Sequence, residues 1–162
     1  TSDWGEEVLT QGGALGLVQK KRQVASSVYA YLNSDKNIDL GIDEYEKYED
    51  SKFNELLRII DEVFRHGTKK IVIFALFRKT LKYLQIRFKK YCFGTLMIHG
   101  QVESRAEILE EFRTNPNAHI LLSSEVGSEG LDMQFCDAIV NYDNAIALFA
   151  DFLNSSGAFF EI

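Results

Sequence analysis

The sequence predicts an α/β fold in which helices cover both faces of a parallel sheet. Short apolar runs of strand length alternate along the chain with longer segments of helical periodicity. This alternation is typical of parallel strands joined by crossover helices. In the strand-like runs, both the odd and the even positions are apolar, as expected for strands that are buried on both faces.

The composition fits one globular domain. The chain has 162 residues, of which 46% are hydrophobic and 26% are charged, so general disorder is excluded. The longest uninterrupted apolar run covers residues 71–77 and is too short to span a bilayer. We therefore expect no membrane partner and a cytoplasmic protein, with association to a nucleoid or nucleus as an option. The chain begins with Thr1, so a piece of a longer protein is expected.

Cysteine usage and charge narrow the function further. Cys92 and Cys136 form no CxxC pair, which favours buried free thiols and no metal site. The net charge of −6 argues against a uniformly basic nucleic-acid-binding surface. However, residues 65–90 carry nine basic residues and no acidic one, while residues 35–62 carry ten acids and four bases. The basic run is either a solvated helix face or a phosphate-facing patch.

Residues 1–50 are expected to hold a lead-in helix and an acidic loop. Apolar residues in segment 17–32 recur at helical spacing, whereas residues 33–50 are polar and acidic. The next helix starts near residue 51, since Asp50 or Ser51 can cap it and an apolar stripe follows. Gly67 can end that helix.

Beyond residue 67, strand-like runs alternate with helical segments. Helices are expected at residues 79–91 and 103–113, and Gly94 is positioned to end the first of them. Four strands are expected between and after these helices, at residues 71–75, 95–98, 119–123 and 138–142.

The residues just after each strand are the candidates for function, because ligands of such sheets bind at the carboxyl ends of the strands. Arg78, Lys79 and Thr80 open a predicted helix after the first strand, where free N–H groups and cations form either a phosphate cradle or an ordinary surface. His99 and Gly100 follow the second strand, and a lone histidine there is either packed or functional.

Hydroxyl groups, glycines and an acid follow the third strand, in residues 123–132. Around Ser123 and Ser124, small residues let backbone N–H groups approach an anion. Asp132 is placed to accept a hydrogen bond from a ribose hydroxyl. Neither GxxxxGK[ST] nor GxGxxG occurs in the chain, which argues against a Rossmann-type cofactor enzyme.

Four segments resemble, in order and spacing, motifs of superfamily 2 helicases of the Swi/Snf-like branch of DNA translocases. Residues 70–81 resemble motif IV and residues 120–132 resemble motif V, and residues 137–143 resemble the strand that follows motif V. Between them, a stretch with the family's HG…R…F spacing is formed by His99, Gly100, Arg105 and Phe112. The resemblance covers about residues 17–143.

The resemblance implies a three-layer RecA-like (P-loop NTPase-type) sheet that forms the second lobe of a motor, over residues 51–162. Its partners would be the N-terminal RecA-like lobe of the same parent protein and nucleic acid, with double-stranded DNA favoured. ATP and Mg²⁺ would serve the intact protein, and this lobe alone would be inactive, with no catalytic or metal residue of its own. Gly130 and Asp132 would line the ATP site. The nucleic-acid contacts would come from Phe77, Arg78, Lys79, Thr80, His99, Gly100, Ser123 and Ser124.

The sequence departs from the family after Asp143. The family continues into motif VI, whose arginines stabilise the transferring phosphate, but the last arginine here is Arg113. Motif VI is therefore either missing near residues 143–144, which we favour, or degenerate. In the first case, residues 158–162 form the closing strand beyond the gap. A non-catalytic RecA-like interaction or scaffold module is the alternative function.

Overall fold

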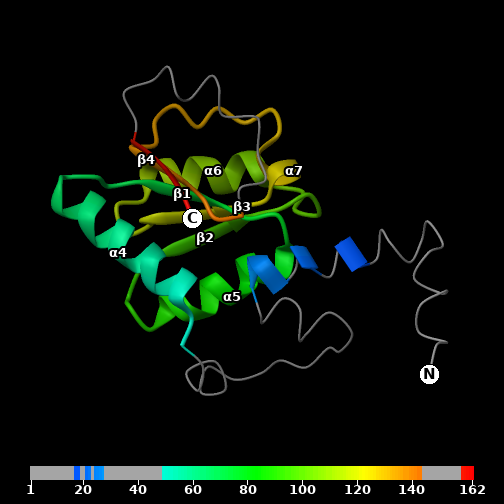
Figure 1. Cartoon of the computed structure of the whole chain (residues 1–162). Helices are drawn as coiled ribbons and strands as arrows, with labels where there is room; N and C mark the ends of the chain where they lie inside the picture. The colour runs from blue at the N-terminus through cyan, green and yellow to red at the C-terminus, as the bar shows by residue number, and fades with distance from the viewer. Residues whose placement is uncertain (1–16, 19–20, 23, 28–48, 144–157) are drawn as a thin grey trace, which may run out of the picture.

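The computed structural model describes residues 17–18, 21–22, 24–27, 49–143 and 158–162 (Figure 1). Five strands form one sheet in the order β2-β3-β1-β4-β5, and every pair is parallel. This confirms the predicted parallel sheet and the closing strand after residue 157. The strands are β1 (Ile71–Phe74), β2 (Thr95–Ile98), β3 (Ile120–Ser123), β4 (Ala138–Asn141) and β5 (Ala158–Glu161).

Helices cover both faces of the sheet, which gives the predicted three layers (Figure 1). One face packs on α4 (Ser51–Arg65) and α5 (Arg78–Lys89), and the other on α6 (Arg105–Thr114). Alternate residues of β1 point to opposite layers: Ile71 and Ile73 join the core under α4 and α5, whereas Val72 and Phe74 join the core under α6. Burial on both faces explains why these strands read as continuous apolar runs.

The ends of α4 follow the sequence signals. The Asp50 carboxylate accepts a hydrogen bond from the Phe53 N–H at 3.0 Å, and Gly67 ends the turn with a φ of 94°. A cap of this kind contributes about 1 kcal/mol. Tyr83 of α5 donates to the second Asp50 oxygen at 2.6 Å, so the cap also joins the two helices of this layer.

Two expectations for the segment after α5 are wrong. The helix ends at Lys89 rather than residue 91, and Gly94 does not end it; Cys92 takes the left-handed conformation on the turn that follows, with a φ of 56°. Gly94 is required for another reason, since a Cβ there would lie 1.8 Å from the backbone oxygen of Asn117. Cys92 was expected to be buried, but it is an exposed free thiol on this turn, whereas Cys136 is buried and free as predicted.

The remaining parts of the prediction fall partly or wholly outside the described residues. Within the expected lead-in helix, residues 17–18, 21–22 and 24–26 are helical. Residues 28–48, which include the acidic loop, and residues 144–157, where motif VI would be sought, lie outside the described residues. Across the part of the chain that is described, no helix has the length and apolar character of a membrane span.

Candidate nucleic-acid interface

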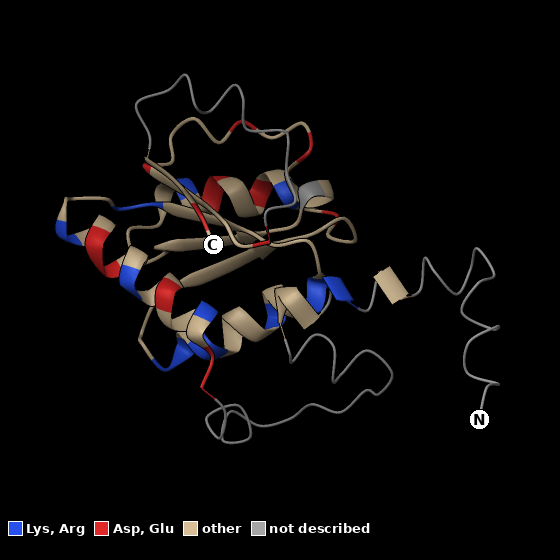
Figure 2. Cartoon of the chain, viewed as in Figure 1, with Lys and Arg blue, Asp and Glu red and all other residues tan. Residues whose placement is uncertain are grey.

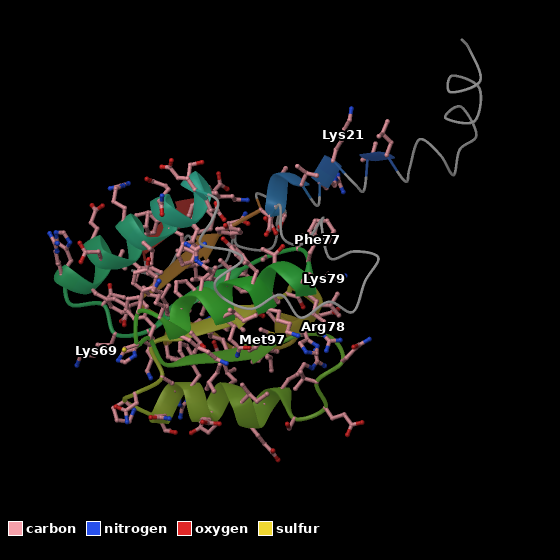
Figure 3. The ribbon with its side chains drawn as sticks, turned by 90° about the horizontal axis from the view of Figure 1, so that it is seen from below. Lys21, Lys69, Phe77, Arg78, Lys79 and Met97 are labelled. Carbon is pink, nitrogen blue, oxygen red and sulfur yellow. The ribbon has the colours of Figure 1, made fainter. Side chains whose placement is uncertain are left out.

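The predicted site segments leave the sheet side by side. Ser123 at the end of β3 is in register with Phe74 of β1 on one side and Ile98 of β2 on the other. The three segments that follow these strands therefore share one edge of the sheet, as expected. In Figure 3, Phe77, Arg78 and Lys79 lie together, far from Lys69, which precedes β1 at the opposite edge.

The start of α5 presents positive charge at this edge. Phe77 is the N-cap and provides no side-chain cap, so no side chain at that position occupies the N–H groups of the first turn. The first turn of α5 holds Arg78 and Lys79 and no acid, whereas Arg87 and Lys89 lie in the last turn, away from this edge (Figure 2). Arg78 is exposed and donates to the side-chain oxygen of Gln101, while Lys79 is half-buried. The helix dipole and these cations together favour an anion here.

The hydroxyl groups of the site differ in access. Thr80 is fully buried, and its hydroxyl lies 2.7 Å from the hydroxyl of Ser26 in the lead-in segment. Ser123 is also buried and donates to the backbone oxygen of Ser124 at 3.0 Å. Ser124 is half-buried, and its hydroxyl accepts from the Gly127 N–H at 3.0 Å. Of the three, Ser124 is the hydroxyl residue nearest to solvent.

His99 is a neutral polar group beside these cations. Its Nδ1 accepts from the Gln101 N–H at 3.3 Å. Burial, and secondarily the charge of Arg78, lowers the pKa of His99 below its usual value. A phosphate that approached this edge would reverse part of that effect, because an anion favours the imidazolium.

A four-residue helix, α7 (Glu125–Ser128), follows β3. Gly127 is required there, because an added Cβ would lie 2.6 Å from the backbone oxygen of Ile98. Gly100 is similarly close to Val126, whose Cγ1 would lie 2.9 Å from an added Cβ. Arg105 donates to the Val126 backbone oxygen at 3.0 Å. Motif V therefore packs directly on the end of β2, and Arg105 serves this packing.

The two residues predicted for the ATP site lie beyond α7. Gly130 has a φ of 76° with open space around it, so glycine is needed for its conformation. Asp132 is exposed, and its Oδ1 accepts from the Gln134 N–H at 3.0 Å. Within the described ranges, no three His, Cys, Asp or Glu residues gather in a way that could hold a metal ion.

The sequence did not reveal the ion pair between Lys52 and Asp143. The Lys52 ammonium lies 3.1 Å from Oδ1 of Asp143, and Oδ2 of Asp143 accepts from the Leu76 N–H at 2.7 Å. Asp143 lies in a segment flagged as following a strand, but its lysine partner is 91 residues away. Lys52 lies within an acidic stretch, and no local pattern marked it.

The comparison with protein families decides the relationship. The protein family described as "helicase conserved C-terminal domain" matches residues 51–154 of this chain. The chain belongs to this family. The match supports the resemblance drawn from motifs IV and V, and it begins at α4.

Individual relatives are similar over part of their length. ATP-dependent RNA helicase FAL1 of Candida glabrata is 31% identical over 97 residues, which are 59% of this chain and 23% of that protein. Putative DEAD-box RNA helicase HEL64 of Trypanosoma brucei brucei is 28% identical over 95 residues, which are 57% of this chain and 16% of that protein. The chain thus spans less than a quarter of either relative.

Solved structures confirm the RecA-like fold. The Sulfolobus solfataricus SWI2/SNF2 ATPase core in complex with dsDNA has a TM-score of 0.71 and 20% identity, covering 93% of this chain and 32% of its own. The Sulfolobus solfataricus SWI2/SNF2 ATPase C-terminal domain has a TM-score of 0.67 and 18% identity, covering 93% of this chain and 61% of its own. The expected preference for double-stranded DNA is not supported, because the curated relatives above are RNA helicases.

Proposed function

We propose that this helicase C-terminal domain is the second motor lobe of an ATP-dependent helicase or translocase and contacts the backbone of nucleic acid. One observation carries the proposal. The segments after β1, β2 and β3 emerge from neighbouring strands, beside the start of α5, whose first turn holds Arg78 and Lys79 and no acid. Phosphate contacts of this kind position the polymer without reading its bases, so they fit RNA and DNA equally.

The proposed contacts divide into surface and supporting groups. Arg78, Lys79 and Ser124 are the side chains placed to meet phosphates, with His99 beside them. Phe77 and Gly100 shape the backbone at the same edge. Thr80 and Ser123 are buried, so we assign them the role of holding the segments in place. These are the residues that the resemblance implied, now sorted by their access.

The intact protein would use ATP and Mg²⁺ between this lobe and an N-terminal RecA-like lobe. Asp132 fits the edge of such a site, because its carboxylate is exposed and could accept a ribose hydroxyl. ATP hydrolysis depends on positioning and charge stabilisation, and its magnesium ligands and phosphate-binding lysine would belong to the other lobe. We therefore expect no phosphate release from ATP by the 162-residue chain alone.

A scaffold role is the second candidate. It is favoured by the lack of any arginine after Arg113, which leaves no arginine finger in the rest of this sequence. Such an arginine accounts for a factor of about 10³–10⁵ in rate in related chemistry. The two functions differ in one measurement: the ATPase rate of the full-length protein with and without nucleic acid.

Lys79→Ala in the full-length protein tests the nucleic-acid contact. We expect weaker binding to every sequence and a salt slope reduced by about 0.7–0.9, the share of one phosphate contact. Lys69→Ala is the matched control, because Lys69 is exposed at the opposite edge of the sheet. RNA and duplex DNA are tested in parallel. Equal affinities and slopes for Lys79→Ala and Lys69→Ala would contradict the proposed contact.

A further inference from the structure

Lys52 lies in the first turn of α4 and contacts groups from distant parts of the chain. Its ammonium lies 3.1 Å from the Asp143 carboxylate and donates to the backbone oxygens of Ala25 at 3.2 Å and Ser26 at 3.5 Å. It also lies 4.1 Å from the centre of the Tyr142 ring. A cation near a helix N-terminus opposes the helix dipole. Lys52 is therefore explained by its partners outside α4 rather than by α4 itself.

Asp143 connects Lys52 to the candidate site. Its side chain is only 4% exposed, and its second oxygen accepts from the Leu76 N–H at 2.7 Å. Leu76 directly precedes Phe77, the N-cap of α5. A buried carboxylate is costly unless a charged partner and hydrogen bonds compensate it. Lys52 supplies the charge, and Asp143 in turn fixes the connection between β1 and α5.

The lead-in segment contacts the same lysine from the other side. Residues 24–26 are helical and residue 27 is not, so Ala25 and Ser26 provide the last carbonyl groups of a helix. Such carbonyls lack partners within the helix and carry partial negative charge, which suits an ammonium. Ser26 is buried and also pairs with Thr80 in the first turn of α5. The segment is thus docked on the first turns of both α4 and α5.

We propose that Lys52 is a positioning residue that joins the end of the lead-in helix to Asp143 and so holds the β1–α5 connection in its binding conformation. Docking of Ala25 and Ser26, which precede the family match at residue 51, then affects the phosphate contacts of Arg78 and Lys79. The effect on nucleic acid rests on the proposed function. The effect on the backbone at residues 75–80 does not, so the two are measured separately.

The experiment uses the full-length protein with Lys52→Met, which keeps the length of the stem and removes the charge. Lys52→Arg keeps the charge, Asp143→Asn keeps an acceptor for Leu76, and Lys69→Met is the control for loss of a lysine. Hydrogen–deuterium exchange is followed over residues 75–80, with residues 120–123 of β3 as the reference for global folding. The ATPase rate is measured against the concentration of RNA and of duplex DNA.

Lys52→Met is expected to speed exchange over residues 75–80 about tenfold, the scale of losing one charged hydrogen bond, with β3 unchanged. The concentration of nucleic acid that gives half-maximal ATPase activity should rise by a larger factor than the maximal ATPase rate falls. Asp143→Asn should also speed exchange over residues 75–80 and raise the nucleic-acid concentration for half-maximal ATPase. Lys52→Arg should leave both quantities near their wild-type values. If Lys52→Met does not fold, Asp143→Asn, which removes the charge of the partner, is compared with Lys52→Arg, which keeps the ion pair.

Two results would overturn the positioning role. The first is exchange over residues 75–80 in Lys52→Met that matches the Lys69→Met control, even if the affinity for nucleic acid falls. An equal acceleration in β3 would also do so, because Lys52 would then support the fold as a whole. Faster local exchange in a protein whose wild-type ATPase ignores nucleic acid would support the Lys52–Asp143 link and refute the proposed function.

Discussion

Gly127→Ala is expected to destabilise the protein although alanine is the better helix former. The new methyl would lie 2.6 Å from the Ile98 oxygen, 2.8 Å from the His99 Cα and 2.9 Å from the Ile98 carbonyl carbon. All three are backbone atoms, so no side chain can rotate away. Real Cβ atoms essentially never lie closer than 3.0 Å to another heavy atom, so α7 and the end of β2 must move apart.

That separation also affects a hydrogen bond, because the same Ile98 oxygen accepts from the Ser124 N–H at 3.1 Å. Overpacking costs about 1–3 kcal/mol, and a weakened hydrogen bond adds up to about 1 kcal/mol. The lower entropy of the unfolded alanine chain offsets about 0.4–1 kcal/mol. The free energy of unfolding should therefore fall by about 1–3 kcal/mol.

Urea denaturation measures this change as a lower midpoint with an unchanged slope. Val126→Ala is the matched control, since the neighbouring Val126 side chain is 60% exposed and its loss should change the midpoint little. A Gly127→Ala midpoint equal to or above wild type would refute the reasoning, because it would mean that α7 can move away from β2 without cost.

Three further outcomes are expected. The affinity for nucleic acid should rise as pH falls below about 6.5, because the pKa of His99 is lowered in the free protein and a phosphate favours the imidazolium, so the complex binds more protons; His99→Gln should remove this slope in a binding titration. A thiol reagent should label Cys92 alone in the native protein and both cysteines after unfolding, since burial raises the pKa of Cys136 to about 12. Tyr83→Phe should lower the free energy of unfolding by about 1–2 kcal/mol in urea, because Asp50 loses a hydrogen bond; an unchanged midpoint would count against that bond.

The strands were predictable because their burial is symmetric. Residues of β1, β3 and β4 are buried on both faces, so local hydrophobicity alone marks them. The position of the candidate site followed from one further rule, that parallel strands end at a common edge. Lys79 could therefore be assigned to the same edge of the sheet as Ser124, although 45 residues separate them along the chain.

What escaped prediction depends on contacts between distant segments. Lys52 pairs with Asp143, and nothing within a few residues of either indicates the other. Gly94 looks like a helix end in the sequence, yet it is fixed by the backbone of Asn117 across the fold. The helix α7 is too short to show a period, and it exists because Ser124 caps it and Gly127 fits against β2.

The place of β3 in the sheet has a consequence for the order in which the chain folds during synthesis. Of the five strands that the structure describes, the first two to be made, β1 and β2, are not neighbours, since β3 lies between them. A nascent chain that ends before residue 120 therefore holds two strands with no ladder between them. Their exposed N–H and C=O groups are open to wrong pairing until β3 is made and inserted. We expect this lobe to fold late on the ribosome and to become resistant to protease only after β3 has emerged.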